Sequence, residues 1–235
     1  MEYEIIHMSK DKWKGTIIPI KYSTDKYYDV LVNQTDKGFN IEIERKDLIK
    51  PITHTPEEYD FPDKLYQDHW ENAYAWGILV NDQLIAAIET DLEIWSNRLR
   101  ITELWVSESY QKQGIGHALI EIAKEQAKRE RRRAIILETQ SCNVNAIDFY
   151  LHEGFTLIGM DTCCYKNDDL HRKEVRLEFG FFIDKKKKLT SEEIEIRMET
   201  KSDWYDVELM TQHAFWNKHH LGCDEHYLVH KLRQD

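Results

Sequence analysis

This chain of 235 residues lacks a long apolar run and a leader-like start. No apolar run approaches the ~20 residues that a membrane-spanning helix needs. The first residues, 1–7, are acidic rather than a cationic segment followed by an apolar one, so we expect no secretory signal. These absences argue against a membrane protein and favour a cytoplasmic location.

Cysteine is scarce, and its spacing forms no pattern typical of disulfides or zinc. The four cysteines are Cys142, Cys163, Cys164 and Cys223. We expect reduced thiols and no bound metal. Cys142 could suggest a covalent acyl intermediate, but no His adjoins it in sequence, which favours a bystander. Cys223, His226 and His230 have helical spacing, yet so few ligands favour a packing or surface role over a metal site.

Cations are also in deficit, because 32 Lys and Arg stand against 43 Asp and Glu, a net charge of −11. This balance disfavours a general nucleic-acid binder and is compatible with a cationic small substrate. The basic run at 128–133 follows a predicted helix, where cations complement the helix dipole. At 41% hydrophobic and 32% charged residues, the chain is typical of a globular protein.

Short strand-like runs fill the first 50 residues, with a turn at 36–38; the runs span 3–7, 15–22, 27–32 and 39–44. The mixed aromatic and charged segment 62–70 predicts a helix. A hairpin follows, in which 73–80 and 84–88 flank the turn pair Asn81-Asp82. Residues 98–107 form the next predicted strand, with Leu104 and Val106 on one face and Glu103 and Trp105 on the other.

Strands and helices alternate in the second half of the chain. Helix 116–129 precedes the apolar strand 134–137, and Asn143 is suited to cap a helix that runs to His152 and stops at Gly154. Two closing strands are predicted at 155–160 and 175–183. This order predicts an α/β (α+β) fold, in which a mixed central sheet has helices on both faces.

The segment Gln111-Lys112-Gln113-Gly114-Ile115-Gly116 lies between a predicted strand and a predicted helix. Glycines let a ligand approach the backbone closely, and the first turn of a helix leaves N–H groups without partners. Together with the helix dipole, these groups favour a bound phosphate. An ordinary strand-to-helix turn is the alternative.

The order of these pieces resembles the GNAT family of acetyl-CoA-dependent N-acetyltransferases. The segment 111–116 matches the family's pyrophosphate-loop pattern, Gln/Arg-x-x-Gly-x-Gly/Ala. A second matching stretch includes 137–140, Asn143, Asn145, Ala146, Phe149, Tyr150, Gly154 and Phe155. With Gly159, Met160, Asp161 and Tyr165 after it, this stretch is similar to streptothricin acetyltransferases. The resemblance covers roughly residues 70–166.

We expect four segments along the chain. Residues 1–55 would form an N-terminal β-rich extension, 56–184 the GNAT acetyltransferase domain, and 185–191 a linker. Residues 192–235 resemble the opening strand and helix of a second GNAT unit, with a strand at 194–198 and a helix capped by Asp203 that ends at Phe215. No pyrophosphate loop follows, so this unit is incomplete.

The family's known cofactor contacts imply roles for residues in both segments. Backbone N–H groups of Gln113 to Gly116 would hold the pyrophosphate of acetyl-CoA, within a loop that begins at Gln111 and Lys112. Extended backbone at Leu104 and Val106 would pair with the pantetheine amides. Asn145 would hydrogen-bond the cofactor arm, although a solvent-facing Asn is the alternative.

Catalytic roles follow from the chemistry of amide formation. The resemblance makes Tyr150 the candidate general acid for the departing thiolate, since a phenol is protonated at neutral pH. A plain core aromatic is the alternative. Glu103 and Glu138 are the candidates for the general base, each weighed against an ion-paired or exposed carboxylate.

Five residues are candidates for the acceptor pocket, three near the hairpin strands and two after the second helix: Asp91, Glu93, Trp105, Asp161 and Tyr165. The predicted reaction moves acetyl from acetyl-CoA to a primary amine of a cationic small molecule, a streptothricin-like antibiotic first among them. A protein or peptide N-acetyltransferase and a non-catalytic acyl-CoA sensor are the alternatives. We expect no nucleic-acid or membrane partner, and a homodimer stays open because many relatives dimerise.

Overall fold

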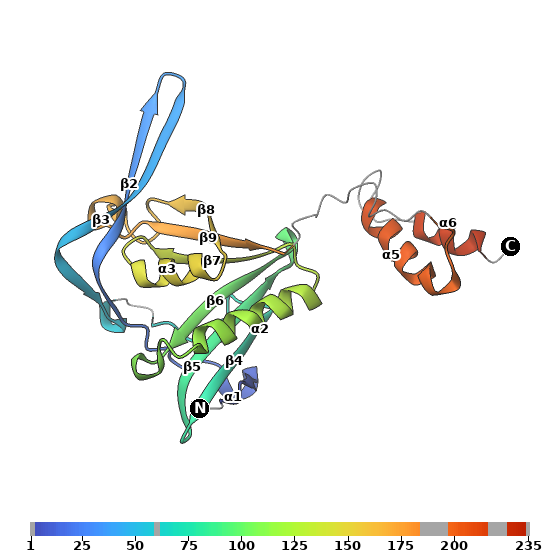
Figure 1. Cartoon of the computed structure of the whole chain (residues 1–235), viewed down its shortest axis with the longest axis horizontal. Helices are drawn as coiled ribbons and strands as arrows, with labels where there is room; N and C mark the ends of the chain where they lie inside the picture. The colour runs from blue at the N-terminus through green and yellow to red at the C-terminus, as the bar shows by residue number, and fades with distance from the viewer. Residues whose placement is uncertain (1–2, 59–61, 184–196, 216–224, 234–235) are drawn as a thin grey trace. The chain divides into compact units, whose positions relative to one another are not determined.

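The structure, a computed structural model, describes residues 3–58, 62–183, 197–215 and 225–233. The chain divides into two compact units, Met1–Lys185 and Lys186–Asp235 (Figure 1). The first unit contains both segments that carry the family resemblance. Within the described ranges, no helix is long and apolar enough to cross a membrane.

The first unit is built on a seven-stranded sheet of order β1-β4-β5-β6-β7-β9-β8. Its strands are β1 (Ile6–Met8), β4 (Ala73–Val80), β5 (Gln83–Glu93), β6 (Arg98–Val106), β7 (Ala134–Gln140), β8 (Thr156–Asp161) and β9 (Arg176–Phe182). β6 and β7 pair in parallel, whereas the other neighbours pair antiparallel. The predicted mixed sheet is confirmed.

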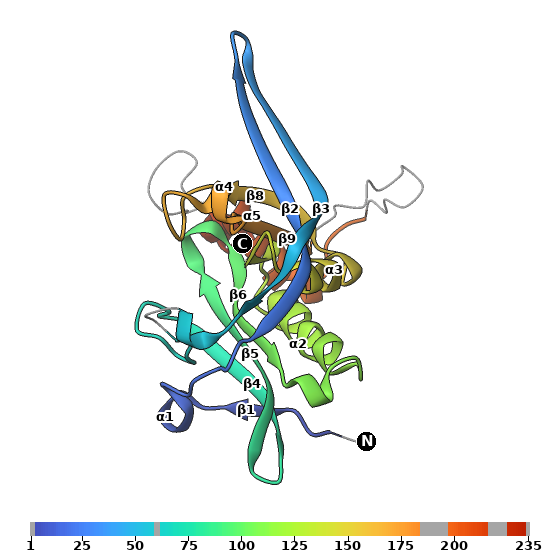
Figure 2. The same cartoon turned by 90° about the vertical axis from the view of Figure 1, so that its left-hand side faces the viewer.

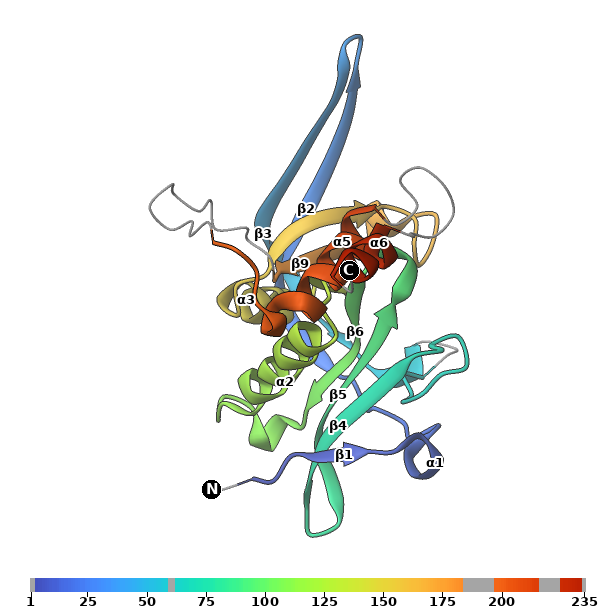
Figure 3. The ribbon, with the colours of Figure 1, turned by 90° about the vertical axis from the view of Figure 1, so that its right-hand side faces the viewer.

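One large apolar core lies between this sheet and two helices, α2 (Ile115–Arg129) and α3 (Val144–His152). Leu119, Ala123 and Ala127 on α2 are fully buried, as their helical spacing predicts. Figure 3 shows α2 lying along β5 and β6, with which it is in contact. Asn143 caps α3 by accepting a hydrogen bond from the Ala146 N–H at 3.3 Å, which confirms the predicted start of this helix.

A second, smaller core covers the opposite face of the sheet through Met8, Ile18, Leu65, Tyr66 and Ala87. The elements here are short: helix α1 (Lys10–Trp13) and the irregular segments around residues 15–20 and 62–66. The remaining short elements of this unit are α4 (Asp169–Arg172) and the 3-10 turns η1 (Pro56–Glu58), η2 (Ile94–Ser96) and η3 (Glu108–Tyr110).

Two predicted elements on this face are wrong. The segment 15–22 is not a strand, and 62–70 is not a helix. The two segments bond to each other instead: Ile17 and Lys64 form an isolated bridge, and the Leu65 N–H donates to the Thr16 carbonyl at 3.0 Å. Backbone groups used in this way cannot form the i to i−4 bonds of a helix.

Within the predicted extension 1–55, β1 joins the seven-stranded sheet, whereas β2 (Tyr22–Thr35) and β3 (Gly38–His54) form a separate two-stranded hairpin. It extends well beyond the seven-stranded sheet (Figure 2). Its base is fixed to the body, because the Tyr28 N–H donates to the Ser141 carbonyl at 2.8 Å and Arg45 forms an ion pair with Asp148 on α3 at 3.0 Å. The strands are much longer than the predicted runs 27–32 and 39–44.

The second unit contains a 3-10 turn, η5 (Lys201–Asp203), and helices α5 (Trp204–Phe215) and α6 (Glu225–Leu232). Thr200 and Asp203 form a reciprocal capping box, so Asp203 helps to start α5, which the structure describes as far as Phe215. Arg233 ties the unit together through Glu199 and Glu208. The linker 185–191 and most of the predicted strand 194–198 lie outside the described residues, and the incomplete second GNAT unit stays a prediction.

Candidate active site

The central feature of the site is a gap between two neighbouring strands. β6 and β7 pair at only three positions, where Arg98 to Arg100 face Ala134 to Ile136. Past Arg100, no strand in the described ranges pairs with the β7-facing edge of β6, although β6 continues to Val106. Unpaired strand edges bind extended chains through main-chain hydrogen bonds. Leu104 and Val106 lie on this free edge, which suits their predicted pairing with a pantetheine arm.

The predicted phosphate-binding loop leads directly into α2. Gly114 is the N-cap of that helix and has φ +83°, a left-handed conformation that favours glycine. The first intrahelical bond runs from the Ala118 N–H to the Gly114 carbonyl at 3.0 Å. The N–H groups just before Ala118 therefore remain available to an anion. No atom lies within 4 Å of the position that a Gly114 Cβ would occupy, so the loop is open on this side.

The other residues of the loop shape it. A Cβ on Gly116 would lie 3.1 Å from the ring of Phe149, so packing against α3 is the reason for glycine there. The Gln111 side chain donates to the Val106 carbonyl at 3.0 Å, and that of Gln113 donates to the Ser109 carbonyl at 3.1 Å. These bonds fasten the loop to the end of β6.

Replacing Gly114 with Val is expected to weaken acetyl-CoA binding by ~10–100-fold, because a β-branched residue resists positive φ and fills the open side of the loop. Calorimetric titration with acetyl-CoA gives the Kd. Gly15 is a matched control, since it has φ +82° and equally open surroundings. Gly15→Val is expected to lower Tm and leave the Kd unchanged. Equal affinity in Gly114→Val and wild type would contradict the anchoring role.

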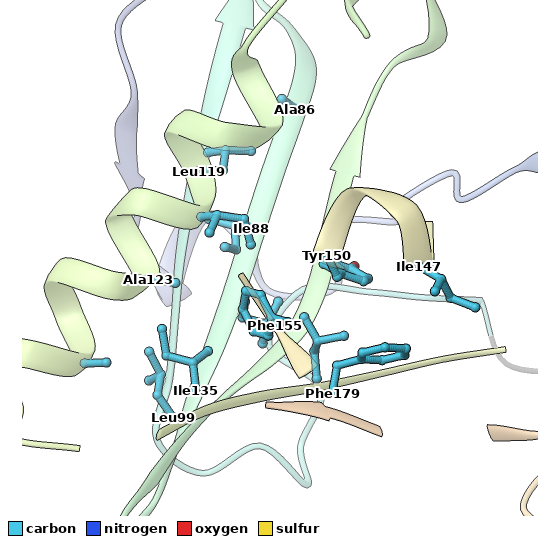
Figure 4. Packing of buried hydrophobic residues seen from close by; sticks show 14 of the residues in the cluster. Ala86, Ile88, Leu99, Leu119, Ala123, Ile135, Ile147, Tyr150, Phe155 and Phe179 are labelled. Atoms are coloured by element: carbon cyan, nitrogen blue, oxygen red, sulfur yellow. The ribbon is translucent and has the colours of Figure 1, made fainter. Parts of the chain in front are cut away.

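Tyr150 lies on α3 in the main core, with 8% of its surface exposed (Figure 4). Its ring packs against Phe155, with 5.9 Å between ring centroids. Its hydroxyl forms no hydrogen bond to another residue in the described ranges. Burial, and secondly the charge of Glu103, raise the pKa of this phenol well above its usual value. Tyr150 is therefore a protonated donor without a partner, near a carboxylate on β6.

Glu103 is 7% exposed, and its carboxylate forms no hydrogen bond or ion pair within the described parts of the chain. It faces Glu89 directly in the antiparallel register of β5 and β6. Burial is the main cause that raises the pKa of Glu103 well above its usual value, and the charges of Asp63, Glu89 and Glu138 add to it. A carboxylate with a raised pKa is suited to accept a proton near neutral pH.

Glu138, the other candidate base, is held by two arginines. Its carboxylate lies 3.3 Å from Arg100 and 2.5 Å from Arg176. These two ion pairs already occupy the Glu138 carboxylate, whereas Glu103 has no such partner in the described residues. We therefore retain Glu103 ahead of Glu138 as the base.

Two of the predicted acceptor residues belong to structural networks. Asp91 is buried and accepts a hydrogen bond from the Asn72 N–H at 2.8 Å, and burial raises its pKa. Glu93 forms ion pairs with Arg98 at 2.7 Å and Arg100 at 2.6 Å. Both carboxylates already have partners within the protein, and these contacts do not favour a role in binding a substrate. That role stays a prediction.

The remaining predicted residues fall in different places. Trp105 packs against the smaller core, on the same face as Glu103. Asp161 accepts a hydrogen bond from the Cys163 N–H at 2.9 Å in the turn after β8, and Tyr165 follows in the same turn. Asn145 is exposed in the first turn of α3. Their proposed contacts with ligands stay predictions.

Cys142 has a histidine beside it in space, although none adjoins it in sequence. Its Sγ lies 3.6 Å from Nε2 of His54, whose Nδ1 is 3.0 Å from Glu58. Burial raises the pKa of the Cys142 thiol to about 11, and the side chain is fully buried. A buried, protonated thiol is a poor nucleophile, which favours the bystander interpretation. Cys223 and the side chain of His226 lie outside the described part of the structure.

The structure brings together a cluster of potential metal ligands that the sequence analysis did not consider. His117, Glu121 and Glu153 place ligand atoms within 4.8 Å of one another. The Lys124 ammonium already lies 2.8 Å from Glu121 and 3.4 Å from Glu153. This lysine supplies the positive charge that a metal would bring, so an ion-pair network accounts for the cluster.

Sequence reasoning missed two acidic residues near Glu103. Glu89 is fully buried on β5, where it accepts hydrogen bonds from the Tyr66 N–H at 2.5 Å and the Thr102 hydroxyl at 2.9 Å. The sequence did contain a signal for Glu89, because this glutamate directly follows the apolar run 84–88 of a predicted strand. Asp63 lies on an irregular segment with no motif, so nothing in the sequence pointed to it.

Comparison with known proteins agrees with this geometry. The family model of the acetyltransferase (GNAT) family matches residues 41–155. A streptothricin acetyltransferase of Escherichia coli is 30% identical over 151 residues, which cover 64% of this chain and 80% of that protein. The chain belongs to the GNAT family. It is accordingly an acetyl-CoA-dependent N-acetyltransferase.

Other GNAT relatives extend the comparison. Streptothricin acetyltransferase A of Bacillus subtilis (strain 168) is 36% identical over 73 residues, covering 31% of this chain and 42% of that protein. The crystal structure of a nourseothricin acetyltransferase has a TM-score of 0.59 at 21% identity, covering 77% of this chain and 99% of that one. A Bacillus anthracis str. Ames protein described as a streptothricin acetyltransferase, in complex with acetyl coenzyme A, has a TM-score of 0.58 at 24% identity, covering 78% and 99%. These two structures share the fold of this GNAT chain.

Proposed function

We propose that this enzyme acetylates a primary amine of a cationic small molecule, with a streptothricin-like antibiotic as the first candidate. The proposal is supported by two buried groups that interact electrostatically, the Tyr150 phenol and the Glu103 carboxylate on the part of β6 beyond its last pair with β7. One is a donor without a partner and the other a buried carboxylate without a partner. Proton donation and proton acceptance are the two tasks that direct acetyl transfer requires.

The roles divide by chemistry. Glu103 accepts a proton from the incoming ammonium, because only the neutral amine has a lone pair for attack on the thioester. Tyr150 donates its proton to the thiolate of coenzyme A as the carbon–sulfur bond breaks, and the second proton, which the attacking nitrogen loses as the amide forms, restores the phenol. The bound pyrophosphate fixes the position of the thioester, which supplies the proximity that an intermolecular reaction lacks.

Charge supports the substrate class. The groups that raise the pKa of Glu103 by their charge are all acidic: Asp63, Glu89 and Glu138. A negative environment attracts a cationic amine and disfavours an anionic acceptor. The E. coli relative is named for streptothricin, and this relationship supports that antibiotic as the first compound to test.

Thiol release from acetyl-CoA, measured with a panel of amines that includes streptothricin, tests the proposal. We expect turnover with streptothricin, and mass spectrometry of the product should show the gain of one acetyl group. Turnover with peptides alone would favour a peptide N-acetyltransferase. Binding of acetyl-CoA without turnover on any amine would contradict the proposed function and favour a sensor.

A further inference from the structure

A second carboxylate without a counter-charge lies close to Glu103. Asp63 is half-buried, and its side chain forms no hydrogen bond or ion pair with any residue that the structure describes. Burial raises its pKa. Among the charges that act on Glu103, that of Asp63 has the largest effect. The Asp63 and Glu103 carboxylates come from separate segments and repel each other, and neither has an ion-pair partner within the described residues.

The segment that carries Asp63 is fixed in place from several sides. The Asp63 carbonyl accepts a hydrogen bond from the Ile18 N–H at 2.9 Å. Three residues later, the Tyr66 N–H donates to Glu89, which is the direct neighbour of Glu103 across β5 and β6. Glu89 is thus a positioning residue for this segment. Asp63 is held near Glu103 by main-chain bonds and is not a freely moving surface acid.

The other charges nearby already have partners. Glu138 forms ion pairs with two arginines. Glu89 accepts two hydrogen bonds, and it is attracted by the charge of Lys10 and repelled by that of Asp91. Asp63 and Glu103 have no such compensation. Two partly or fully buried anions in proximity are unfavourable unless a ligand brings positive charge or one of them is protonated.

We propose that Asp63 is a specificity-determining residue that binds a second ammonium group of the acceptor, so that the enzyme selects amines carrying two positive charges. This inference rests on the proposed function, because it assigns Glu103 to the reacting nitrogen. Glu103 takes the proton of the reacting ammonium and becomes neutral. Asp63 keeps its charge and holds the ammonium that does not react.

Titration of two amines of equal length tests this assignment. Cadaverine and n-pentylamine share a five-carbon chain and differ by one ammonium group. Calorimetry with enzyme saturated with coenzyme A should give a Kd for cadaverine about tenfold below that for pentylamine, the size expected of one partly buried charge pair. In Asp63→Asn the ratio should fall to about one, and in Asp63→Glu it should largely recover.

Asp68→Asn is the matched control, because Asp68 lies on the same segment but is exposed and pairs with Lys14 at 2.5 Å. It should retain the wild-type ratio. Equal affinities of the two amines in wild type, no binding of cadaverine, or an unchanged ratio in Asp63→Asn would each overturn the inference. If Asp63→Asn does not fold, the ratio of the two Kd values in the wild-type enzyme decides whether the inference holds. Thiol release is measured separately, so an enzyme with no turnover on any amine would contradict the proposed function even where the ratio holds.

Discussion

Replacing Tyr150 with Phe is expected to lower kcat by ~100-fold or more while leaving the Kd for acetyl-CoA unchanged. General acids contribute about 10²–10⁴-fold to catalysis, and this phenol is a buried donor with no hydrogen-bond partner in the described ranges. The change removes one oxygen and keeps the ring that packs against Phe155. Stopped-flow or steady-state thiol release gives kcat, and calorimetry gives the Kd.

Stability separates this effect from a packing defect. Because the Tyr150 hydroxyl has no hydrogen-bond partner in the described ranges, Tyr150→Phe should shift the free energy of unfolding by only about 0.5 kcal/mol. Tyr28→Phe is the matched control, as Tyr28 packs against the same core from β2. A kcat within threefold of wild type would remove Tyr150 from the acid role.

The pKa of Tyr150 also bears on the pH profile. Burial raises it above the ordinary value of ~10, so the phenol stays protonated throughout the usual assay range. We therefore expect no loss of activity from its ionisation as the pH rises. A falling limb that disappears in Tyr150→Phe would contradict this.

Replacing Glu103 with Gln should have the second large effect, a ~100–1,000-fold loss in kcat/KM through loss of the general base. The wild-type profile should rise with pH as Glu103 ionises and then level off, because the carboxylate is the form that accepts a proton. Because the pKa of Glu103 is raised, this rise in activity should occur at a higher pH than the ionisation of an ordinary glutamate. In Glu103→Gln the limb should disappear.

The same substitution should stabilise the fold near neutral pH. The folded chain binds the Glu103 proton more tightly than the unfolded chain, whose pKa is near ~4.3. Stability is therefore lost as the pH rises from that value through the raised pKa of the folded state. Glu103→Gln removes this loss, and we expect its Tm at neutral pH to exceed that of wild type by about 2–4 °C.

Glu138→Gln is the control that distinguishes the two candidate bases. It should leave kcat/KM within a few-fold of wild type and lower Tm, because Arg100 and Arg176 lose their carboxylate partner. If Glu138→Gln abolishes turnover while Glu103→Gln retains it, the assignment of the base is reversed.

The sequence predicted the parts of the fold that local rules determine. Helix α2 follows from the spacing of Leu119, Ala123 and Ala127, and the start of α3 from the capping residue Asn143. The turn at Asn81-Asp82 has positive φ at both residues, as a tight hairpin requires. Each of these signals lies within a few residues of the structure that it specifies.

Structural features that depend on contacts between distant segments could not be predicted from the sequence. The segment 62–70 resembles a helix in composition, but its main-chain groups bond to residues 15–18. The position of Asp63 depends on those long-range pairings, and Cys142 contacts His54 although 88 positions separate them in the sequence. The ion pairs that occupy Glu138 and Glu93 likewise join residues from different strands and turns.

The separation of β6 from β7 also has no local signature, because it is the absence of pairing beyond Arg100. Only the family resemblance pointed toward it, because it implies that extended backbone at Leu104 and Val106 pairs with the pantetheine amides. Whether this gap holds the cofactor is thus the central question.

A crystal structure of the enzyme with acetyl-CoA tests that claim most directly. We expect the pyrophosphate against the N–H groups of Gln113 to Gly116, the pantetheine arm along Leu104 and Val106, and the sulfur within hydrogen-bond reach of the Tyr150 hydroxyl. A cofactor bound away from the β6–β7 gap, or a Tyr150 hydroxyl too far from the sulfur even for one bridging water, would contradict the account.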